Sequence, residues 1–208
     1  MERFIVVDYH AGNLASVLNA FCHLGISVKA SSDPSEIAEA DRLVFPGVGA
    51  ARSAMETLER SGIGNAIRRV VERKRPVLGI CIGCQIILDA SEENGGVKCL
   101  GFIDGKAVRF REEPGIKIPQ MGWNQVNFLK RHPLFEGVPD GGDFYFVHSY
   151  HPDSVSAENA LARTTFGSQS FVSALCRENL VATQFHLEKS GNVGLRVLKN
   201  FSKWSGVC

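Results

Sequence analysis

Short apolar segments alternate with amphipathic segments through the first half of this 208-residue chain, and this alternation constrains the fold more than any other feature. The apolar segments have the length and β-branched content of strands; they are residues 4–8, 26–30, 42–45 and 77–81. Between them, apolar residues recur on one helical face, at residues 14–22, 50–60 and 63–74. Short strands that alternate with helices are typical of βαβ units, in which helices cover both faces of a parallel sheet.

The second half has a different pattern, in which strand candidates follow one another with turns between them. These candidates are residues 101–111, 126–129, 144–150, 170–177 and 180–185. A final segment, residues 193–204, has helical spacing. We therefore predict an α/β fold with a mostly parallel central sheet and an antiparallel excursion in the second half, formed as a single domain over residues 1–208.

Positive and negative side chains nearly cancel, with 23 Lys and Arg against 22 Asp and Glu. A nucleic-acid binder that works by electrostatic attraction carries a basic excess, so we expect no nucleic-acid partner. No apolar run approaches the roughly 20 residues that span a bilayer, and the first residues lack the features of an export signal. The sequence therefore predicts a cytoplasmic protein with no membrane association and with reduced cysteines.

One cysteine lies where a predicted strand meets a predicted helix, in the segment Leu-Gly-Ile-Cys-Ile-Gly-Cys-Gln at residues 78–85. Gly79 and Gly83 flank Cys81 at two residues on either side, as a sharp strand-to-helix turn requires. Such a turn exposes the sulfur at the carboxyl edge of the sheet, over a helix N-terminus that favours the thiolate. The N–H group of Ile82 then points to where an oxyanion would form. The pattern indicates a nucleophilic cysteine.

Other interpretations of this segment stay open. Cys81 can be a small core residue that precedes a tight turn. Cys81 and Cys84 can form a redox pair, although the thioredoxin-like setting is missing. A zinc site would need a second cysteine pair, and Cys99 and Cys176 stand alone. The nucleophile interpretation requires a base elsewhere in the chain.

A histidine and a carboxylate stand two residues apart, at His186 and Glu188, where a predicted strand ends. Residues i and i+2 of a strand face the same way, so we expect the two side chains to converge. A cysteine nucleophile needs an imidazole that accepts its proton, and a carboxylate behind the ring fixes the tautomer. A lone histidine is more often structural, and His148 and His151 are alternative bases, but the neighbouring Glu188 favours His186.

A glycine-rich loop, Phe-Pro-Gly-Val-Gly at residues 45–49, follows another predicted strand. It lacks the Lys-Ser/Thr ending and the spacing of phosphate-binding loops, which leaves a plain turn or an oxyanion loop. In enzymes with a nucleophile elbow, the loop after a neighbouring strand supplies a second N–H group to the oxyanion. Gly47 and Gly49 leave this backbone free to approach a substrate and to flip.

Together these motifs resemble those of the class I glutamine amidotransferases. Gly-Ile-Cys-x-Gly-x-Gln at residues 79–85 is similar to the nucleophile elbow of that family, and Phe-His-x-Glu at residues 185–188 is similar to its base and acid. Further motifs resemble those of the glutaminase subunits of imidazole glycerol phosphate synthases; they are residues 8–14, 45–49, 119–124 and 146–150. The resemblance implies a flavodoxin-like, three-layer fold that releases ammonia from L-glutamine.

The resemblance also implies a partner and a pathway. The ammonia would pass to a separate cyclase subunit, a (β/α)8 barrel, bound as a heterodimer. That subunit would make imidazole glycerol phosphate and an aminoimidazole carboxamide ribotide in histidine biosynthesis, and no cofactor or metal is implied. A class I glutaminase of another pathway, of the vitamin B6 or anthranilate type, remains an alternative. So do a stand-alone cysteine hydrolase and a non-catalytic module with the same fold.

Residue by residue, the resemblance assigns four sets of positions. The catalytic residues are Cys81, His186 and Glu188. The backbone of the oxyanion site belongs to Val48, Gly49 and Ile82. The residues that bind glutamine are Gly49, Gln85, Ser149 and Tyr150. The partner interface and ammonia tunnel include Asn13, Trp123, Tyr145 and Lys189.

Three departures from the family pattern accompany these matches. His10 and Ala11 replace a glycine and a small or apolar residue, and Cys84 replaces a methionine. Leu187 replaces a proline between the base and the acid, which removes one constraint on φ. None of the replacements removes a chemical group that the reaction uses.

Overall fold

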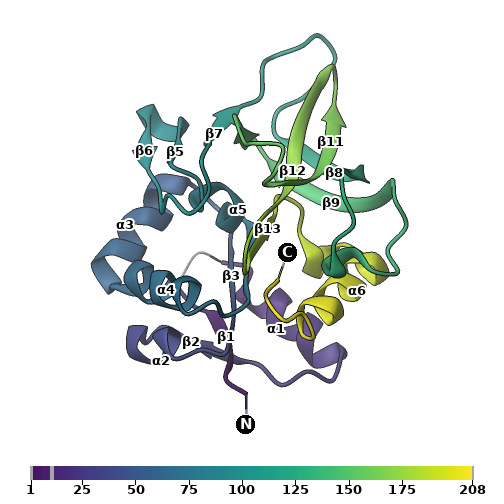
Figure 1. The fold of residues 1–208 in the computed structure, drawn as a ribbon. Helices are drawn as coiled ribbons and strands as arrows, with labels where there is room; N and C mark the ends of the chain where they lie inside the picture. Colours follow the sequence, from purple (N-terminus) through teal and green to yellow (C-terminus); the bar gives the residue numbers. More distant parts are fainter. Residues whose placement is uncertain (1, 10–11, 208) are drawn as a thin grey trace.

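The parallel half of the fold is a sheet of five neighbouring strands in the order β2-β1-β3-β4-β13, seen in the computed structural model, which describes residues 2–9 and 12–207 (Figure 1). Each strand is parallel to its neighbour. The strands are β1 (Phe4–Val7), β2 (Lys29–Ser31), β3 (Arg42–Gly47), β4 (Val77–Cys81) and β13 (Leu180–Thr183). Four of them match the candidate strands of the first half, and β13 joins β4 from the far end of the sequence.

The same sheet continues beyond β13 with four antiparallel strands, in the order β12-β11-β8-β9. They are β8 (Gln120–Phe128), β9 (Gly142–His148), β11 (Ala160–Phe166) and β12 (Gln169–Arg177). The predicted α/β fold with a parallel sheet and an antiparallel second half is confirmed. The sequence did not predict β11, and it placed the start of β8 at residue 126 instead of Gln120.

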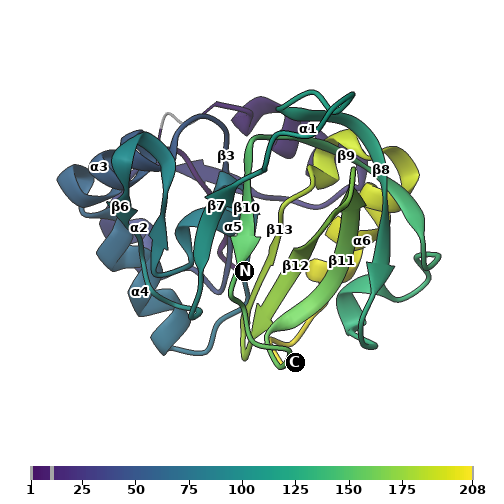
Figure 2. The same cartoon turned by 90° about the horizontal axis from the view of Figure 1, so that it is seen from above.

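Helices cover both faces of this sheet, as Figures 1 and 2 show. One face carries α2 (Pro34–Ala38), α3 (Ala51–Ser61), α4 (Ile63–Glu72) and α5 (Ile82–Ile86). The other face carries α1 (Leu14–His23) and α6 (Gly191–Phe201). The three layers follow from the buried character of the parallel strands, whose residues are covered on both sides.

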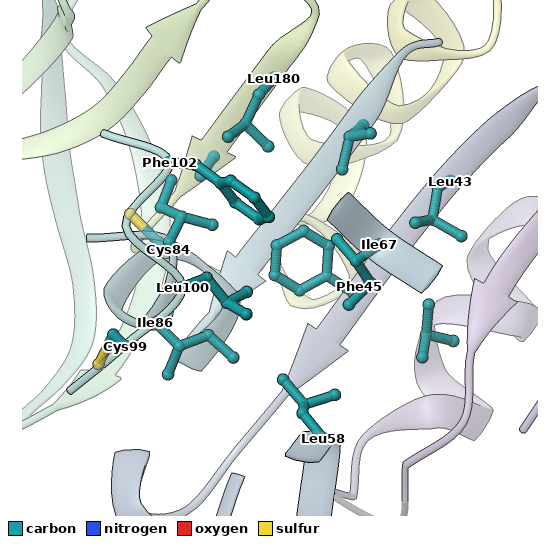
Figure 3. Packing of buried hydrophobic residues seen from close by; sticks show 14 of the residues in the cluster. Leu43, Phe45, Leu58, Ile67, Cys84, Ile86, Cys99, Leu100, Phe102 and Leu180 are labelled. Atoms are coloured by element: carbon teal, nitrogen blue, oxygen red, sulfur yellow. The ribbon is translucent and has the colours of Figure 1, made fainter. Parts of the chain in front are cut away.

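Each face of the sheet has its own apolar core. On the side of α2–α5, Phe45 of β3 is completely buried and packs among side chains from the helices and from residues 99–102 (Figure 3). Helix α4 reaches this core because Ile63, Ile67 and Val70 recur at helical spacing. On the side of α1 and α6, Phe21 and Phe201 are completely buried in the second core.

A smaller sheet of four strands, in the order β10-β7-β5-β6, accompanies the main sheet within the described residues. Its strands are β5 (Ala90–Ser91), β6 (Val97–Lys98), β7 (Lys106–Arg109) and β10 (Tyr150–Asp153). Three 3₁₀ turns complete the described structure: η1 (Glu93–Gly95), η2 (Pro133–Phe135) and η3 (Leu187–Lys189). Among residues 2–9 and 12–207, no helix has both the length and the apolar character that crossing a membrane requires.

Three strand ends meet at one edge of the main sheet. In the register of the parallel strands, Gly47 at the end of β3 lies opposite Cys81 at the end of β4. Thr183 at the end of β13 lies opposite Ile80, one residue before Cys81. Open α/β sheets bind their ligands at the carboxyl ends of such strands, so we expect the functional site in the loops that follow these three residues.

Candidate active site

Cys81 ends β4 and begins α5, so the predicted nucleophile occupies a strand-to-helix turn. Its backbone has φ 55° and ψ −102°, a conformation that residues with a Cβ rarely adopt. The side chain is 5 % exposed. Backbone strain of this kind persists only where the surrounding structure enforces it, and it is typical of nucleophile elbows.

Two glycines make this turn possible, because neither position has room for a side chain. A Cβ at Gly83 would lie 2.5 Å from the backbone oxygen of Phe45, and a Cβ at Gly79 would lie 3.0 Å from the backbone of Gly83. The elbow is therefore pressed against the neighbouring strand β3. This close packing is what holds Cys81 in its strained conformation.

The structure brings His186 and Glu188 together by a route that the sequence did not predict. Strand β13 ends at Thr183, and Glu188 lies in the 3₁₀ turn η3, so the two side chains do not share a strand face. The turn places Nδ1 of His186 2.7 Å from Oε1 of Glu188, with both side chains completely buried. The backbone N–H of His186 donates to the carbonyl of Tyr145 at 2.9 Å, which anchors the base to β9.

The pKa values of this pair move in opposite directions. Burial lowers the pKa of His186, but the neighbouring Cys81 and Glu188 outweigh burial and raise it to about 10. Burial raises the pKa of Glu188, but its hydrogen bond to His186 and the charge of that ring outweigh burial and lower it. At neutral pH the pair is therefore an imidazolium and a carboxylate.

The Cys81 sulfur and Nε2 of His186, the two reacting atoms, each have few hydrogen-bond contacts in this structure. Nε2 of His186 has no hydrogen-bond partner among the described residues. The Cys81 sulfur lies 4.0 Å from the carbonyl oxygen of Val147 and 3.9 Å from Nε2 of Gln184. Catalytic hydrogen bonds are often long in substrate-free enzymes and tighten when the substrate binds.

Asn13 supports the acid directly. Its Nδ2 atom donates to Oε1 of Glu188 at 2.5 Å and lies 3.2 Å from Nδ1 of His186. Asn13 precedes α1 with φ 64°, a left-handed conformation that asparagine tolerates, and its side chain does not cap the helix. Its assignment to the partner interface stays a prediction, while its side chain belongs to the hydrogen-bond network of the base and acid.

A cavity of about 280 Å³ lies beside Cys81. Every predicted oxyanion and glutamine-binding position contributes to its lining: Val48, Gly49, Ile82, Gln85, Ser149 and Tyr150. The lining also includes Glu93, Pro119 and His148, which the sequence did not assign to substrate binding. Glu93 belongs to η1, whose position in the sequence carries no recognisable motif.

Gln85 also connects the elbow to its surroundings. Its Nε2 atom donates to the carbonyl of Tyr150 at 2.8 Å and to Oε1 of Gln184 at 3.1 Å. Gln184 is completely buried and extends its own Nε2 toward Cys81. The sequence did not single out Gln184, although it stands two residues before His186.

Cys84 is a packing residue within α5. Cys81 and Cys84 are both free thiols, and Cys84 is completely buried. Burial raises the pKa of Cys84 well above its ordinary value, so it carries no thiolate at neutral pH. Leu187 is also completely buried. The departures at His10 and Ala11 lie outside the described residues.

The alternative bases have a different environment. His148 lines the cavity but lies among aromatic rings, and burial lowers its pKa to about 3. Burial also lowers the pKa of His151. Nδ1 of His148 bonds the carbonyl of Tyr150 at 2.8 Å. His148 stays neutral and hydrogen-bonds no carboxylate among the described residues, so it is a poorer acid–base candidate than His186.

Three of the predicted interface residues form one surface group, which we call the Trp123 group. The rings of Trp123 and Tyr145 meet edge to face with centroids 6.0 Å apart, and Nζ of Lys189 lies 5.9 Å from the centroid of the Tyr145 ring. Trp123 is 58 % exposed, and Met121, on the same face of β8, is 66 % exposed. Tyr145 is also the residue whose carbonyl anchors His186, so this group borders the catalytic pair.

The profile of the family described as "Glutamine amidotransferase class-I" matches residues 5–204. The chain belongs to this family. The amidotransferase fold is shared with a solved glutamine amidotransferase at a TM-score of 0.75 and 18 % identity, covering 98 % of this chain and 99 % of that one. PurLQS from Thermotoga maritima gives a TM-score of 0.72 at 17 % identity, with 97 % and 98 % covered.

More similar relatives of this amidotransferase share a single name. This chain is 48 % identical over 198 residues to "Imidazole glycerol phosphate synthase subunit HisH" of Dehalococcoides mccartyi strain CBDB1, with 95 % of each chain covered. It is 44 % identical over 206 residues to the protein of that name from Acinetobacter baylyi, with 99 % of this chain and 100 % of that one covered. The predicted enzyme class, a glutamine amidotransferase, is confirmed.

Proposed function

We propose that this amidotransferase is the glutaminase subunit of an imidazole glycerol phosphate synthase, formed as one domain over residues 1–208 and active in the cytoplasm. The observation that carries the proposal is the strained Cys81 turn beside the buried His186–Glu188 pair and a small cavity. The shared name of relatives that match nearly the whole chain supports the pathway. The reaction is hydrolysis of L-glutamine to glutamate and ammonia.

The cavity suits a substrate of this size. Pockets for drug-sized ligands run from about 300 to 1,000 Å³, and the cavity beside Cys81 is about 280 Å³. A free amino acid fits that space better than a nucleotide does. The polar lining from Gln85, Glu93 and Ser149 can meet the charged α-carbon end of glutamine while the side-chain amide approaches the sulfur.

The first half of the reaction forms a thioester. The Cys81 thiolate attacks the side-chain amide carbon of glutamine, and the C–N bond breaks as His186 gives its proton to the departing nitrogen. The raised pKa of His186 supplies that proton at neutral pH. Glu188 and Asn13 hold the ring in the tautomer in which Nε2 carries the transferred proton.

The second half restores the enzyme. Neutral His186 takes a proton from water, the resulting hydroxide attacks the thioester carbon, and glutamate leaves as the Cys81 thiolate reforms. Both tetrahedral intermediates carry a negative oxygen, for which the N–H groups of Ile82 and Val48 are the proposed donors. Removing one such donor costs about 3 kcal/mol, or a hundredfold or more in rate.

The ammonia is passed to a cyclase subunit with a (β/α)8 barrel, bound as a heterodimer. The Trp123 group is the proposed docking surface, because exposed aromatic rings beside a lysine fit an interface with a packed centre and a charged rim. Its connection to His186 through Tyr145 supports a docking position beside the reacting atoms. The partner would then convert the ammonia into imidazole glycerol phosphate and an aminoimidazole carboxamide ribotide.

The proposal is tested with Cys81→Ala and the control Cys84→Ala, each assayed in complex with the cyclase subunit. We expect Cys81→Ala to lose glutamine-dependent product formation and to keep product formation from added ammonium salt. Cys84→Ala should keep both, because Cys84 only packs in the core. Glutamine-dependent activity that survives Cys81→Ala would show that the nucleophile is misassigned.

A further inference from the structure

A second cavity lies on the other side of the loop that lines the active site. It measures about 400 Å³ and shares Val48 and Gly49 with the cavity beside Cys81. The remaining lining comes mainly from α3 and from the segment after β1, and includes Tyr9 and Gly12. The Val48–Gly49 segment is therefore a wall between two cavities, with space on both sides into which its peptide groups can turn.

Tyr9, which lines this second cavity, has an unusual hydroxyl. Tyr9 is 3 % exposed, and its hydroxyl has no hydrogen-bond partner in the described structure. Burial first, and the neighbouring Cys81 second, raise the pKa of Tyr9, so the oxygen keeps its proton and stays a donor. A buried hydroxyl without a partner is costly and calls for a specific explanation.

This hydroxyl lies directly against Gly47. A Cβ at Gly47 would lie 2.1 Å from the Tyr9 oxygen and 2.2 Å from Cγ2 of Ile82. The hydroxyl thus occupies the space that a side chain would fill, and the carbonyl group of Gly47 is bonded to the same Cα. A rotation about the backbone of Gly47 can bring its carbonyl oxygen to the hydroxyl.

The geometry of a peptide group connects this contact to catalysis. The unit that joins Gly47 to Val48 is planar and trans, so its C=O and N–H groups point in opposite directions. If the Val48 N–H turns into the cavity beside Cys81, the Gly47 carbonyl turns out of it, toward the cavity that Tyr9 lines. One rotation would complete the oxyanion site and give the Tyr9 hydroxyl its acceptor.

We propose that Tyr9 is a positioning residue, whose hydroxyl donates to the carbonyl oxygen of Gly47 when the Val48 N–H turns toward the oxyanion. The inference rests on the proposed glutaminase function. Because the hydroxyl has no partner in the present structure, this hydrogen bond stabilises only the catalytic arrangement of the loop. Tyr9 thereby favours the active loop without touching the substrate.

The test is Tyr9→Phe, which removes one oxygen atom and keeps the ring. The full chain is assayed alone and with the cyclase subunit. We expect kcat for glutamine hydrolysis in the complex to fall at least about tenfold, with KM changed less than about twofold, because loop orientation affects the transition state more than glutamine binding. Product formation from ammonium salt should be unchanged. The melting temperature should not fall, since no hydrogen bond is lost from the resting structure.

Two further measurements separate this role from simple packing. Alkylation of Cys81 by iodoacetamide, followed by mass spectrometry, needs no oxyanion site and should proceed at the rate of the unsubstituted chain. The matched control is Thr164→Val, which removes a buried hydroxyl that does have a partner, Ser173 at 2.9 Å. Thr164→Val should lower the melting temperature and leave kcat unchanged.

Two outcomes would overturn the role of Tyr9, and a third would refute the proposed glutaminase function. If kcat of the Tyr9→Phe complex equals that of an active unsubstituted complex, the inference about Tyr9 is wrong while the proposed function stands. A fall in kcat that comes with a lower melting temperature and slower alkylation would also overturn it, because the ring would then be acting through packing. An unsubstituted complex that releases no ammonia from glutamine would instead refute the proposed function.

Discussion

Adding a single methyl group at Gly83 should destabilise the protein more than the same addition at Gly79 or Gly64. The Cβ of Gly83→Ala would lie 2.5 Å from the backbone oxygen of Phe45, which belongs to strand β3 and cannot rotate away. Overpacking of a close-packed interior costs about 1–3 kcal/mol, and a collision with sheet backbone belongs at the upper end. We therefore expect Gly83→Ala to lower the free energy of unfolding by about 3 kcal/mol, or the melting temperature by roughly 6–12 °C.

Two other glycines provide the comparison. At Gly79 the nearest backbone atoms lie 3.0 Å from the added Cβ, so Gly79→Ala should cost about 1–2 kcal/mol. At Gly64, in helix α4, the nearest atom is 3.6 Å away, which is ordinary contact. Alanine favours a helix over glycine by up to about 1 kcal/mol, so Gly64→Ala should stabilise the protein slightly.

Urea unfolding followed by circular dichroism gives the three free energies, and glutamine hydrolysis gives the functional effect. The elbow variants should lose kcat along with stability, because Cys81 owes its conformation to this packing. Gly64→Ala should keep kcat. If Gly83→Ala unfolds at the same urea concentration as Gly64→Ala, the elbow is not pressed against β3, and the argument for an enforced strained turn is wrong.

Two further predictions concern the acid–base pair and the loop. Glu188→Gln should lower the pKa of His186 from about 10, measurable by NMR titration of the ring, because burial is then opposed by Cys81 without the Glu188 carboxylate. The pair stabilises the fold fully between pH 4.5, the ordinary pKa of Glu188, and pH 6.5, the ordinary pKa of His186. The stabilisation is lost at low pH, as the pH falls through the lowered pKa of Glu188, and at high pH, as the pH rises through about 10. The stability lost in Glu188→Gln should therefore be greatest between pH 4.5 and 6.5, and a loss that grows above pH 10 would contradict this. For the loop, glutamine hydrolysis by the isolated chain should rise at least about tenfold, or 1.4 kcal/mol of barrier, when the cyclase and its nucleotide ligand are added. Gly49→Pro should abolish that rise without unfolding the protein, because proline cannot adopt the φ of 98° that Gly49 has, whereas Gly49→Ala, with no atom within 4 Å of the new Cβ, should retain part of it.

The sequence predicted the parallel half of the fold well because four of its five strands, β1, β3, β4 and β13, are buried on both faces. A strand of that kind is a continuous apolar run, as in β3 and β4, and can be recognised without knowing its neighbours. Strand β11 combines apolar residues with one arginine and two threonines, and the first part of β8 contains Gly122 and exposed side chains. Their strand character comes from pairing with distant segments, which no local pattern records.

The candidate site divides in the same way. The elbow could be predicted because it is a local feature: glycines two residues before and after a cysteine indicate a sharp turn that needs small neighbours. The pairing of His186 with Glu188 was expected on a strand face, but a 3₁₀ turn produces it. Asn13 lies more than 170 positions away in the sequence from both, and only the packing of α1 beside η3 brings its amide to the carboxylate. Tyr9 and Gln184 belong to the same class of long-range contact.

These observations also indicate where control over catalysis would act. The base and acid are fully buried, hydrogen-bonded to each other at 2.7 Å and supported by Asn13, so little in that pair is left to adjust when a partner binds. The Val48–Gly49 segment has the opposite character: it has a cavity on each side, and Val48 is 37 % exposed. A partner that changes the orientation of this segment can add or remove one oxyanion donor, which changes the rate of glutamine hydrolysis a hundredfold or more. Only a local backbone rotation is needed. Ammonia release would then follow the state of the partner while the catalytic pair stays ready throughout.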